Sequence, residues 1–226
     1  MRRFEKLPEC FQCEEVRPYY ELLSHKTASR VFKRIFDILV SFIMLVFLIV
    51  PIIVISIIVK CTSTGPAFFC QERVTTYGRR FKIFKFRTMV VNAESLGTQV
   101  TTDCDSRVTG IGRFLRKYRL DELPQVFNVL SGSMSFVGTR PEVPRYVEQY
   151  EKEYYATLLL PAGITSLASI MYKDEEKLLA SAEDADRVYI EKVLPDKMKY
   201  NLEYTKNFGF WSDIKLMFKT VKEVVS

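Results

Sequence analysis

The hydrophobic pattern of the chain is dominated by one segment, from Ile38 to Val59, which is a run of 22 uncharged residues, nearly all of them Leu, Ile, Val, Phe or Met. As a helix this run extends about 33 Å, the thickness of the hydrocarbon core of a bilayer. Ser41 and Ser56 are too few to form the polar stripe that a core helix of a soluble domain usually shows. The run also begins too late, and is too long, for a signal peptide. The pattern predicts membrane insertion, with the soluble core helix as the alternative.

Two features bear on how this segment meets the membrane. Pro51 lies in the middle of the run, where it removes a backbone hydrogen bond and predicts a kink or break. Basic residues flank both ends: Arg30, Lys33 and Arg34 before the run, and Lys60, Arg73, Arg79 and Arg80 after it. Positive flanks favour the cytoplasmic side, so we prefer a re-entrant helix-break-helix that enters and leaves by one face. The alternative is a bitopic anchor with a proline kink.

The remaining pattern predicts an α+β chain in three parts. Residues 1–29 are a loosely ordered lead-in, residues 30–60 hold an amphipathic approach and the membrane segment, and residues 61–226 form a small, mostly helical domain. Strand patterns at Ala67–Gln71 and Arg80–Arg87 predict a β-hairpin. Helical patterns are found at Asp121–Leu130, with Asp121 as N-cap, and at Val143–Leu159, Asp174–Ala182, Asp184–Val193 and Trp211–Val225.

The last of these helices is amphipathic, with lysines opposite an apolar face. It can lie on the membrane surface, but we favour packing on the domain with a solvated basic face.

Composition narrows the classes of function. The chain is 48% hydrophobic and 27% charged, which is a globular balance, and its net charge of +6 favours an anionic partner. Five cysteines without a signal peptide indicate reduced thiols. Cys10 and Cys13 have metal-ligand spacing, but no second pair follows and His25 is the only histidine, so a zinc site is not favoured.

Candidate chemistry concentrates between Asp105 and Pro141. Several cations precede the adjacent carboxylates Asp121 and Glu122, and Arg140 follows them. Arginine side chains and helix N-termini attract phosphate oxygens, an ionised Asp can attack phosphorus, and a neighbouring Glu can hold Mg²⁺. The pattern therefore indicates a phosphate and metal site. The alternative is ordinary helix capping beside a solvated basic face.

Three other patterns are weaker. The Gly110-Ile111-Gly112 sequence lacks the third glycine or Walker lysine of a nucleotide loop and is interpreted as a turn before a helix. The serines from Ser131 to Ser135 have no nearby histidine that would make a hydrolase. Phe and Lys alternate between Phe81 and Arg87, which superficially resembles a strand whose aromatic side chains stack on nucleic-acid bases. The membrane segment argues against a nucleic acid as partner, because it would hold such a strand at a bilayer.

A spaced series of segments resembles the bacterial monotopic phosphoglycosyl transferases, over about residues 30 to 226. The matching segments are Lys33 to Asp37, Gly65-Pro66 through Arg73, Lys85 to Met89, Leu120 to Gln125, Asn128 to Ser135, Val137 to Pro141, and Gly163 to Thr165. A series of this length is far more specific than any single motif.

The resemblance implies an enzyme that moves a sugar-1-phosphate from a UDP-sugar to polyprenyl (undecaprenyl) phosphate, releasing UMP, with Mg²⁺ as cofactor. It implies that Asp121 is the nucleophile of a covalent phosphosugar intermediate and that Glu122 binds the metal. Arg140 and Arg116 would contact phosphate, with Lys85 and Arg87 as further candidates. It also implies a monotopic protein whose re-entrant helix, broken at Pro51, holds the catalytic domain on the cytoplasmic face of the bacterial inner membrane.

The sequence departs from the family pattern at several positions, without losing a charged candidate: Val50, Thr75, Ser106, Thr139 and an inserted Ala162. The Ala162 insertion is expected to reshape its loop or shift its register. The sugar, the polymer or glycoconjugate pathway, homo-oligomers and contacts with downstream glycosyltransferases stay open. A membrane-anchored relative that binds lipid or partner enzymes without catalysis is the alternative function.

Overall fold

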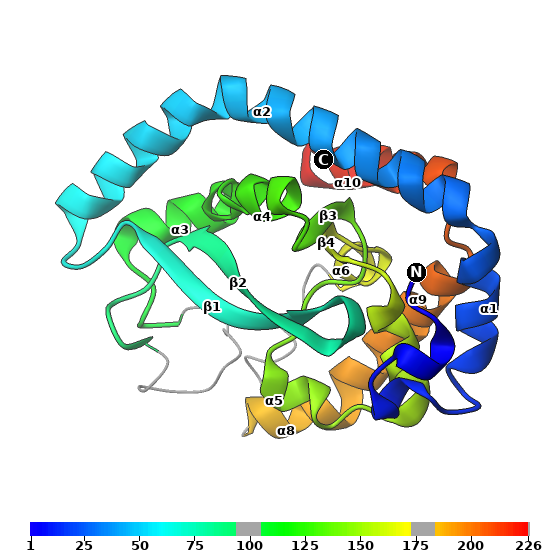
Figure 1. Cartoon of the computed structure of the whole chain (residues 1–226). Coiled ribbons are helices and arrows are strands. Elements are labelled where there is room, and N and C mark those ends of the chain that lie inside the picture. The colour runs from blue at the N-terminus through cyan, green and yellow to red at the C-terminus, as the bar shows by residue number, and fades with distance from the viewer. Residues whose placement is uncertain (94–104, 173–183, 226) are drawn as a thin grey trace.

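The computed structural model describes residues 1–93, 105–172 and 184–225 and is an α+β structure (Figure 1). The predicted Asp174–Ala182 helix lies outside these residues. The described part contains two small sheets, one made of the strands β1 and β2 and the other of β3 and β4, surrounded by helices. The α+β class predicted from the sequence is confirmed.

The apolar run belongs to a single long helix, α2 (Thr27–Thr62), which also includes the amphipathic approach. The predicted break at Pro51 does not occur, because α2 stays helical through that residue. Proline removes only one backbone hydrogen bond, and this can bend a helix without ending it. Figure 1 shows α2 as an arch over α3 (Gly110–Lys117), α4 (Gln125–Ser131) and β3 (Met134–Val137).

Most of the surface of α2 is apolar and exposed. In its most hydrophobic 18-residue window only 11% of the residues are buried, and the helix is long and apolar enough to cross a membrane. The exposed large side chains include Phe32, Leu39, Phe42, Val46, Phe47, Val50, Ile53 and Ile57. A core helix of a soluble domain would be buried, so this exposure favours lipid contact over that alternative.

Both halves of α2 are attached to the rest of the fold. In the first half, Lys33 donates to the carbonyl of Val137 at 2.8 Å and forms a buried ion pair with Asp213. In the second half, Ile52 and Val59 pack with Phe86 and Leu115 in a small separate core.

The predicted hairpin is confirmed and is longer than expected. β1 (Phe68–Thr75) pairs antiparallel with β2 (Arg79–Phe86), from Phe68 opposite Phe86 to Thr75 opposite Arg79. The connecting turn η3 (Thr76–Gly78) holds Tyr77 at φ 59° and Gly78 at φ 74°. The second sheet is parallel, with β3 beside β4 (Ala162–Thr165), and Ala162 lies opposite Met134. Ala162, the inserted residue, is therefore the first residue of a strand.

The Val143–Leu159 helix predicted from the sequence is wrong. Pro144 starts a short helix, α5 (Pro144–Val147), and a 3₁₀ segment, η6 (Lys152–Leu159), follows after an interruption. Residues 156–160 are all buried. A continuously buried stretch has no solvent face, so its apolar content was mistaken for part of an amphipathic helix.

The later helices agree better with the prediction. Asp184 caps α8 (Ala185–Val188), which continues through a π-helical turn, η7 (Tyr189–Val193), into α9 (Leu194–Lys206) and so extends further than predicted. α10 (Phe210–Val225) matches the predicted C-terminal helix and packs through Asp213 and Leu216. Its outer face carries not only lysines but also Trp211 and Phe218, each 74% exposed.

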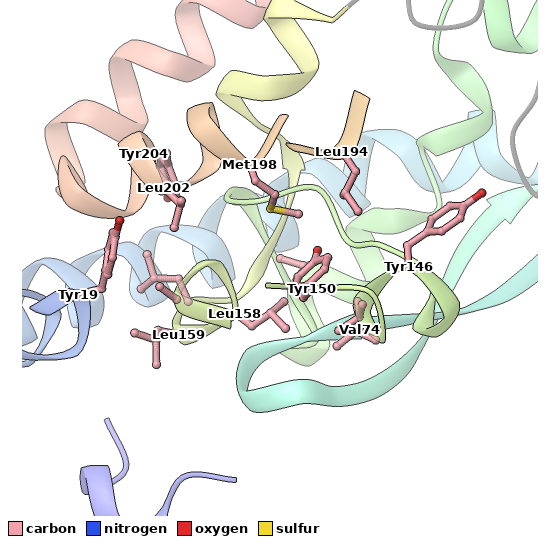
Figure 2. Close-up of a cluster of buried hydrophobic side chains, with 14 of the residues drawn as sticks. Tyr19, Val74, Tyr146, Tyr150, Leu158, Leu159, Leu194, Met198, Leu202 and Tyr204 are labelled. Atoms are coloured by element: carbon pink, nitrogen blue, oxygen red, sulfur yellow. The ribbon is translucent and has the colours of Figure 1, made fainter. Parts of the chain in front are cut away.

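The first residues of the chain are more ordered than predicted. They form two 3₁₀ turns, η1 (Phe4–Lys6) and η2 (Glu9–Phe11), and a helix, α1 (Arg17–His25). Phe11, Val16 and Leu23 are fully buried in the main core, together with residues of the hairpin, η6 and α9. Figure 2 shows Tyr19 from α1 facing the same cluster as Leu159 and Leu202. The expected loose lead-in is therefore wrong, because tertiary packing orders a segment that has no clear periodicity of its own.

Candidate active site around Asp121 and Glu122

The two adjacent carboxylates lie in a 3₁₀ turn, η5 (Leu120–Glu122), between α3 and α4. Arg119 precedes this turn in the left-handed conformation, at φ 55°. The predicted N-cap role of Asp121 is wrong, since α4 begins at Gln125 with Pro124 as its N-cap. Asp121 is consequently not committed to a helix end.

The Gly110-Ile111-Gly112 segment, interpreted from the sequence as a turn, is instead the first turn of α3. Thr109 caps this helix by accepting a hydrogen bond from the amide of Gly112 at 3.0 Å. A side chain at Gly112 would collide with the carbonyl of Thr88 at 2.1 Å, so the glycine allows α3 to approach the segment after β2 closely. η5 begins three residues after the end of α3, so this contact ties the region of η5 to the segment after β2.

Glu122 is held between two cations from distant parts of the chain. Its Oε1 accepts from Lys85 Nζ at 3.0 Å and from Arg140 Nη2 at 2.5 Å. The Glu122 side chain is only 11% exposed. Burial opposes its ionisation, but Arg140 and Lys85 outweigh that effect and hold the pKa of Glu122 well below its ordinary value. Glu122 is therefore ionised.

Asp121 has a different environment, although it is the next residue. It is 7% exposed, and within the described part of the chain no hydrogen bond or ion pair reaches its carboxylate. Burial raises the pKa of Asp121, and the neighbouring charge of Glu122 raises it further. The cations Lys85 and Arg116 act in the opposite direction and lower it. One carboxylate is thus held by cations, while the other is buried without a direct partner and is the more basic of the two.

The position of Arg140 is set by the small parallel sheet. The amide of Gly138 donates to Thr165 at 3.0 Å and the amide of Gly163 donates to Thr139 at 2.9 Å, which pairs the chain just before Arg140 with β4. A side chain at Gly163 would collide with the backbone of Gly138 at 2.1 Å. Glycine at these positions therefore allows two backbones to meet, and Arg140 leaves that junction toward Glu122.

Two more arginines lie near the site. Arg116, on α3, is half-buried and close enough to Asp121 to influence its pKa. Arg73, on β1, donates to the carbonyl of Pro141 at 3.0 Å and to Gln71 Oε1 at 2.6 and 3.0 Å. Arg73 was not predicted as a site residue, and the only signal for it was its place in the Gly65 to Arg73 segment of the family resemblance.

Arg87 differs from the other predicted site residues. Its guanidinium donates to the carbonyl of Ser63 at 2.8 Å and to the Ser63 hydroxyl at 2.7 Å, at the C-terminal end of α2. Gly65, at φ 114°, leaves the space that this guanidinium occupies. The structure therefore brings together Asp121, Glu122, Lys85 and Arg140, with Arg116 nearby, and places Arg87 at the C-terminal end of α2.

The two carboxylates suit Mg²⁺. This ion commonly uses one or two carboxylates together with substrate phosphates, rather than an all-protein cage. Glu122 Oε2 has only a 3.5 Å contact with Arg140, and the Asp121 carboxylate has no partner among the described residues. Those residues contain no group of three or more His, Cys, Asp or Glu that could hold a metal alone. The donor set therefore fits a magnesium ion that is shared with a phosphate ligand.

The chain is similar to known proteins over most of its length. Residues 28–226 match the family described as bacterial sugar transferase. The chain is 38% identical over 174 residues to a UDP-N-acetylgalactosamine-undecaprenyl-phosphate N-acetylgalactosaminephosphotransferase of Aeromonas hydrophila, a match covering 76% of this chain and 38% of the relative.

Two further relatives differ in their sugar. The chain is 38% identical over 197 residues to a UDP-glucose:undecaprenyl-phosphate glucose-1-phosphate transferase of Klebsiella pneumoniae, covering 85% of this chain and 40% of the relative. It is 34% identical over 218 residues to an undecaprenyl-phosphate galactose phosphotransferase of Salmonella typhimurium, a match covering 88% of this chain and 42% of the relative. The chain spans about two fifths of the length of these relatives.

Proposed function

The chain belongs to the bacterial sugar transferase family, and from that membership we propose that it transfers a sugar-1-phosphate from a UDP-sugar to polyprenyl phosphate, with release of UMP. The observation that carries this proposal is the pair of unlike carboxylates. Asp121 is buried and has no direct partner among the residues that the structure describes, whereas Glu122 is held by Lys85 and Arg140. The relatives, whose names describe phosphotransfer to undecaprenyl phosphate, support the acceptor and the donor class.

In the proposed first step, an ionised Asp121 oxygen attacks the phosphorus that bears the sugar. A bond forms between that oxygen and phosphorus, the bond from phosphorus to the UMP oxygen breaks, and the electron pair leaves with UMP. In the second step an oxygen of the lipid phosphate attacks the same phosphorus and releases Asp121. Burial favours this role, because a poorly solvated carboxylate with a raised pKa is a better nucleophile than a solvated one.

The cations are proposed to bind the diphosphate. Arg140 and Lys85 already meet at Glu122, and a diphosphate close to that carboxylate would bring its oxygens within reach of both. Arg116 adds positive charge on the Asp121 side. Mg²⁺, held by Glu122 with Asp121, would neutralise charge on the transferring and leaving phosphates.

The long helix supports a location at the membrane. We place α2 in the bilayer of the bacterial inner membrane as a re-entrant arch, with the catalytic residues on the cytoplasmic face. Both halves of α2 are bonded to the same domain, through Lys33 in the first half and through Ser63 just after its end. Cysteines introduced singly at Glu21 and Lys60, in a cysteine-free background, should react with a membrane-impermeant maleimide from the cytoplasmic side alone. Labelling of either from the periplasm would contradict this topology.

The reaction is tested by measuring UMP release from a panel of UDP-sugars with polyprenyl phosphate and Mg²⁺. We expect release with at least one donor, a covalent phosphosugar adduct on wild type, and loss of both in Asp121→Asn. Asp196→Asn, which removes a carboxylate on the surface of α9, is the matched control and should retain activity. Full turnover by Asp121→Asn would refute the nucleophile assignment. No release across the panel from folded protein would instead favour a lipid- or partner-binding role.

A further inference from the structure

A buried carboxylate outside the candidate site lies two residues beyond Arg140. Glu142 is 5% exposed, and its Oε1 accepts a hydrogen bond from Tyr189 Oη at 2.7 Å and lies 3.4 Å from Lys197 Nζ. Lys197 also donates to Tyr189 Oη at 2.9 Å. The three side chains, called here the Glu142 cluster, form a closed triangle of contacts.

The Glu142 cluster joins two distant parts of the chain. Glu142 follows β3, whereas Tyr189 and Lys197 come from η7 and α9 near the C-terminus. Tyr189 and Lys197 are 2% and 4% exposed. A lysine and a glutamate rarely lie this deep, because removing charges from water costs more than an average ion pair returns. The proposed chemistry at Asp121 and Glu122 uses none of these three side chains, so their burial needs another explanation.

The cluster borders the backbone that carries Arg140. The carbonyl of Glu142 accepts from the amide of Val74 at 3.0 Å, and the carbonyl of Pro141 accepts from Arg73 at 3.0 Å. Residues 141 and 142 are therefore held directly by β1. In Figure 2, Val74 of β1 lies among the same group of buried side chains as Tyr146 and Leu194.

Charge gives Glu142 a specific role. Its carboxylate is paired directly with Lys197 and accepts from Tyr189, whereas the ion pair of Arg140 is with Glu122. Burial opposes ionisation of Glu142, but Lys197 and Arg73 outweigh it and keep the pKa of Glu142 below its ordinary value. The ionised carboxylate therefore ties residue 142 to η7 and α9, while β1 holds the backbone of residues 141 and 142.

We propose that Glu142, held by Tyr189 and Lys197, fixes residues 141 and 142 and thereby positions Arg140 in the binding site for a nucleoside diphosphate. This proposal rests on the proposed function, since it assigns the diphosphate to the same site. Glu142, Tyr189 and Lys197 are positioning residues in this arrangement. Their effect reaches the ligand through Arg140, and through Arg73 acting on Pro141.

The test is Tyr189→Phe, which removes one hydroxyl and keeps the ring that packs on Tyr146 at 4.6 Å between centroids. The matched control is Tyr146→Phe, which removes a similar hydrogen bond, from Tyr146 Oη to Asp186 at 2.7 Å, in the same cluster of rings. Equilibrium binding of UDP in the presence of Mg²⁺ is measured for the full chain in detergent or nanodiscs. The KM and kcat for UMP release are measured in parallel.

We expect Tyr189→Phe to weaken UDP binding and raise the donor KM by about tenfold, the size of one charge-assisted hydrogen bond, with kcat changed much less. A purely structural role would reduce the amount of active protein. The apparent kcat would then fall, while KM and the UDP dissociation constant would stay unchanged. Tyr146→Phe should show only that structural effect. Glu142→Gln, which keeps the shape and removes the charge, should weaken UDP binding at least as much as Tyr189→Phe.

The outcomes separate this inference from the reaction. UMP release by wild type, with equal UDP affinities in wild type, Tyr189→Phe and Glu142→Gln, would overturn the positioning role alone. Absence of UMP release, with UDP binding that weakens in both variants, would overturn the reaction and support the positioning role. Absence of UDP binding to folded wild type would overturn both.

Discussion

The ion pairs at Glu122 make a quantitative prediction about stability. Glu122→Gln keeps the size of the side chain but removes the charge that Lys85 and Arg140 share. Breaking one partner of a fully buried ion pair costs about 3–5 kcal/mol. The Lys85 and Arg140 side chains are 20% and 29% exposed, and glutamine retains one acceptor oxygen, so solvent and that oxygen recover part of the loss. We therefore expect Glu122→Gln to lose about 2–3 kcal/mol of unfolding free energy.

The assay is thermal unfolding followed by circular dichroism at pH 7. For a chain of this size, about 2–4 °C accompanies each kcal/mol, so Tm should fall by about 4–12 °C. The matched control is Glu72→Gln, because Glu72 pairs with Arg80 at 3.1 Å on the surface, where ion pairs contribute about 0–1 kcal/mol. Its Tm should fall by no more than about 4 °C.

The pH dependence of this difference follows from the lowered pKa of Glu122. A carboxyl whose pKa is depressed in the folded state stabilises the fold above its ordinary pKa of 4.5, and that contribution is lost as the pH falls toward the folded value. The gap in Tm between wild type and Glu122→Gln should therefore be constant near neutral pH and shrink below pH 4.5. Equal melting temperatures of wild type and Glu122→Gln at pH 7 would refute the account of Glu122 as a counter-ion.

Two further predictions follow from the site. Because burial raises the pKa of Asp121, the acid limb of a plot of kcat/KM for UMP release against pH should lie above the ordinary aspartate value of 3.8. Arg116 lowers this pKa, so Arg116→Met should move the acid limb to higher pH. An acid limb at pH 3.8 or below would contradict a buried environment for Asp121. Because Arg87 is hydrogen-bonded to Ser63 at the end of α2, Arg87→Ala should lower Tm and leave the donor KM unchanged. A selective rise in the donor KM with unchanged Tm would show instead that Arg87 contacts phosphate.

The sugar is the property on which the family evidence is least specific. The three relatives named above are described with N-acetylgalactosamine, glucose and galactose, at 38%, 38% and 34% identity. Similar scaffolds are therefore named with different sugars, and a panel of donors is needed rather than one expected substrate. The Glu142 cluster concerns the diphosphate, so its test can be done with UDP before the sugar is known.

Some features of this chain were predictable because they depend on local composition. The apolar run from Ile38 to Val59 determined a long lipid-compatible helix, and alternation around Tyr77-Gly78 determined the hairpin. Adjacent carboxylates after a basic stretch pointed to Asp121 and Glu122 without any structure. Each of these signals is carried by neighbouring residues, so a window of the sequence contains it whole.

Other features were decided only by tertiary structure. Proline at position 51 predicted a broken helix, but α2 continues through it, held on the same domain in both halves. Residues 1–25 carried no periodicity, yet Phe11 and Leu23 are buried because η6 and α9 complete their core.

The candidate site illustrates the same division. The sequence by itself determined which residues carry the charges, and it placed Asp121 beside Glu122 along the chain. Only the fold decided which charges meet. Lys85 lies 37 residues before Glu122 and Arg140 lies 18 residues after it, yet both contact one oxygen of Glu122. Arg87, in contrast, is directed to the end of α2. These ion pairs depend on the hairpin, the 3₁₀ turn and the parallel sheet approaching each other in space. Their energies come from burial and distance, which no local pattern of residue types contains.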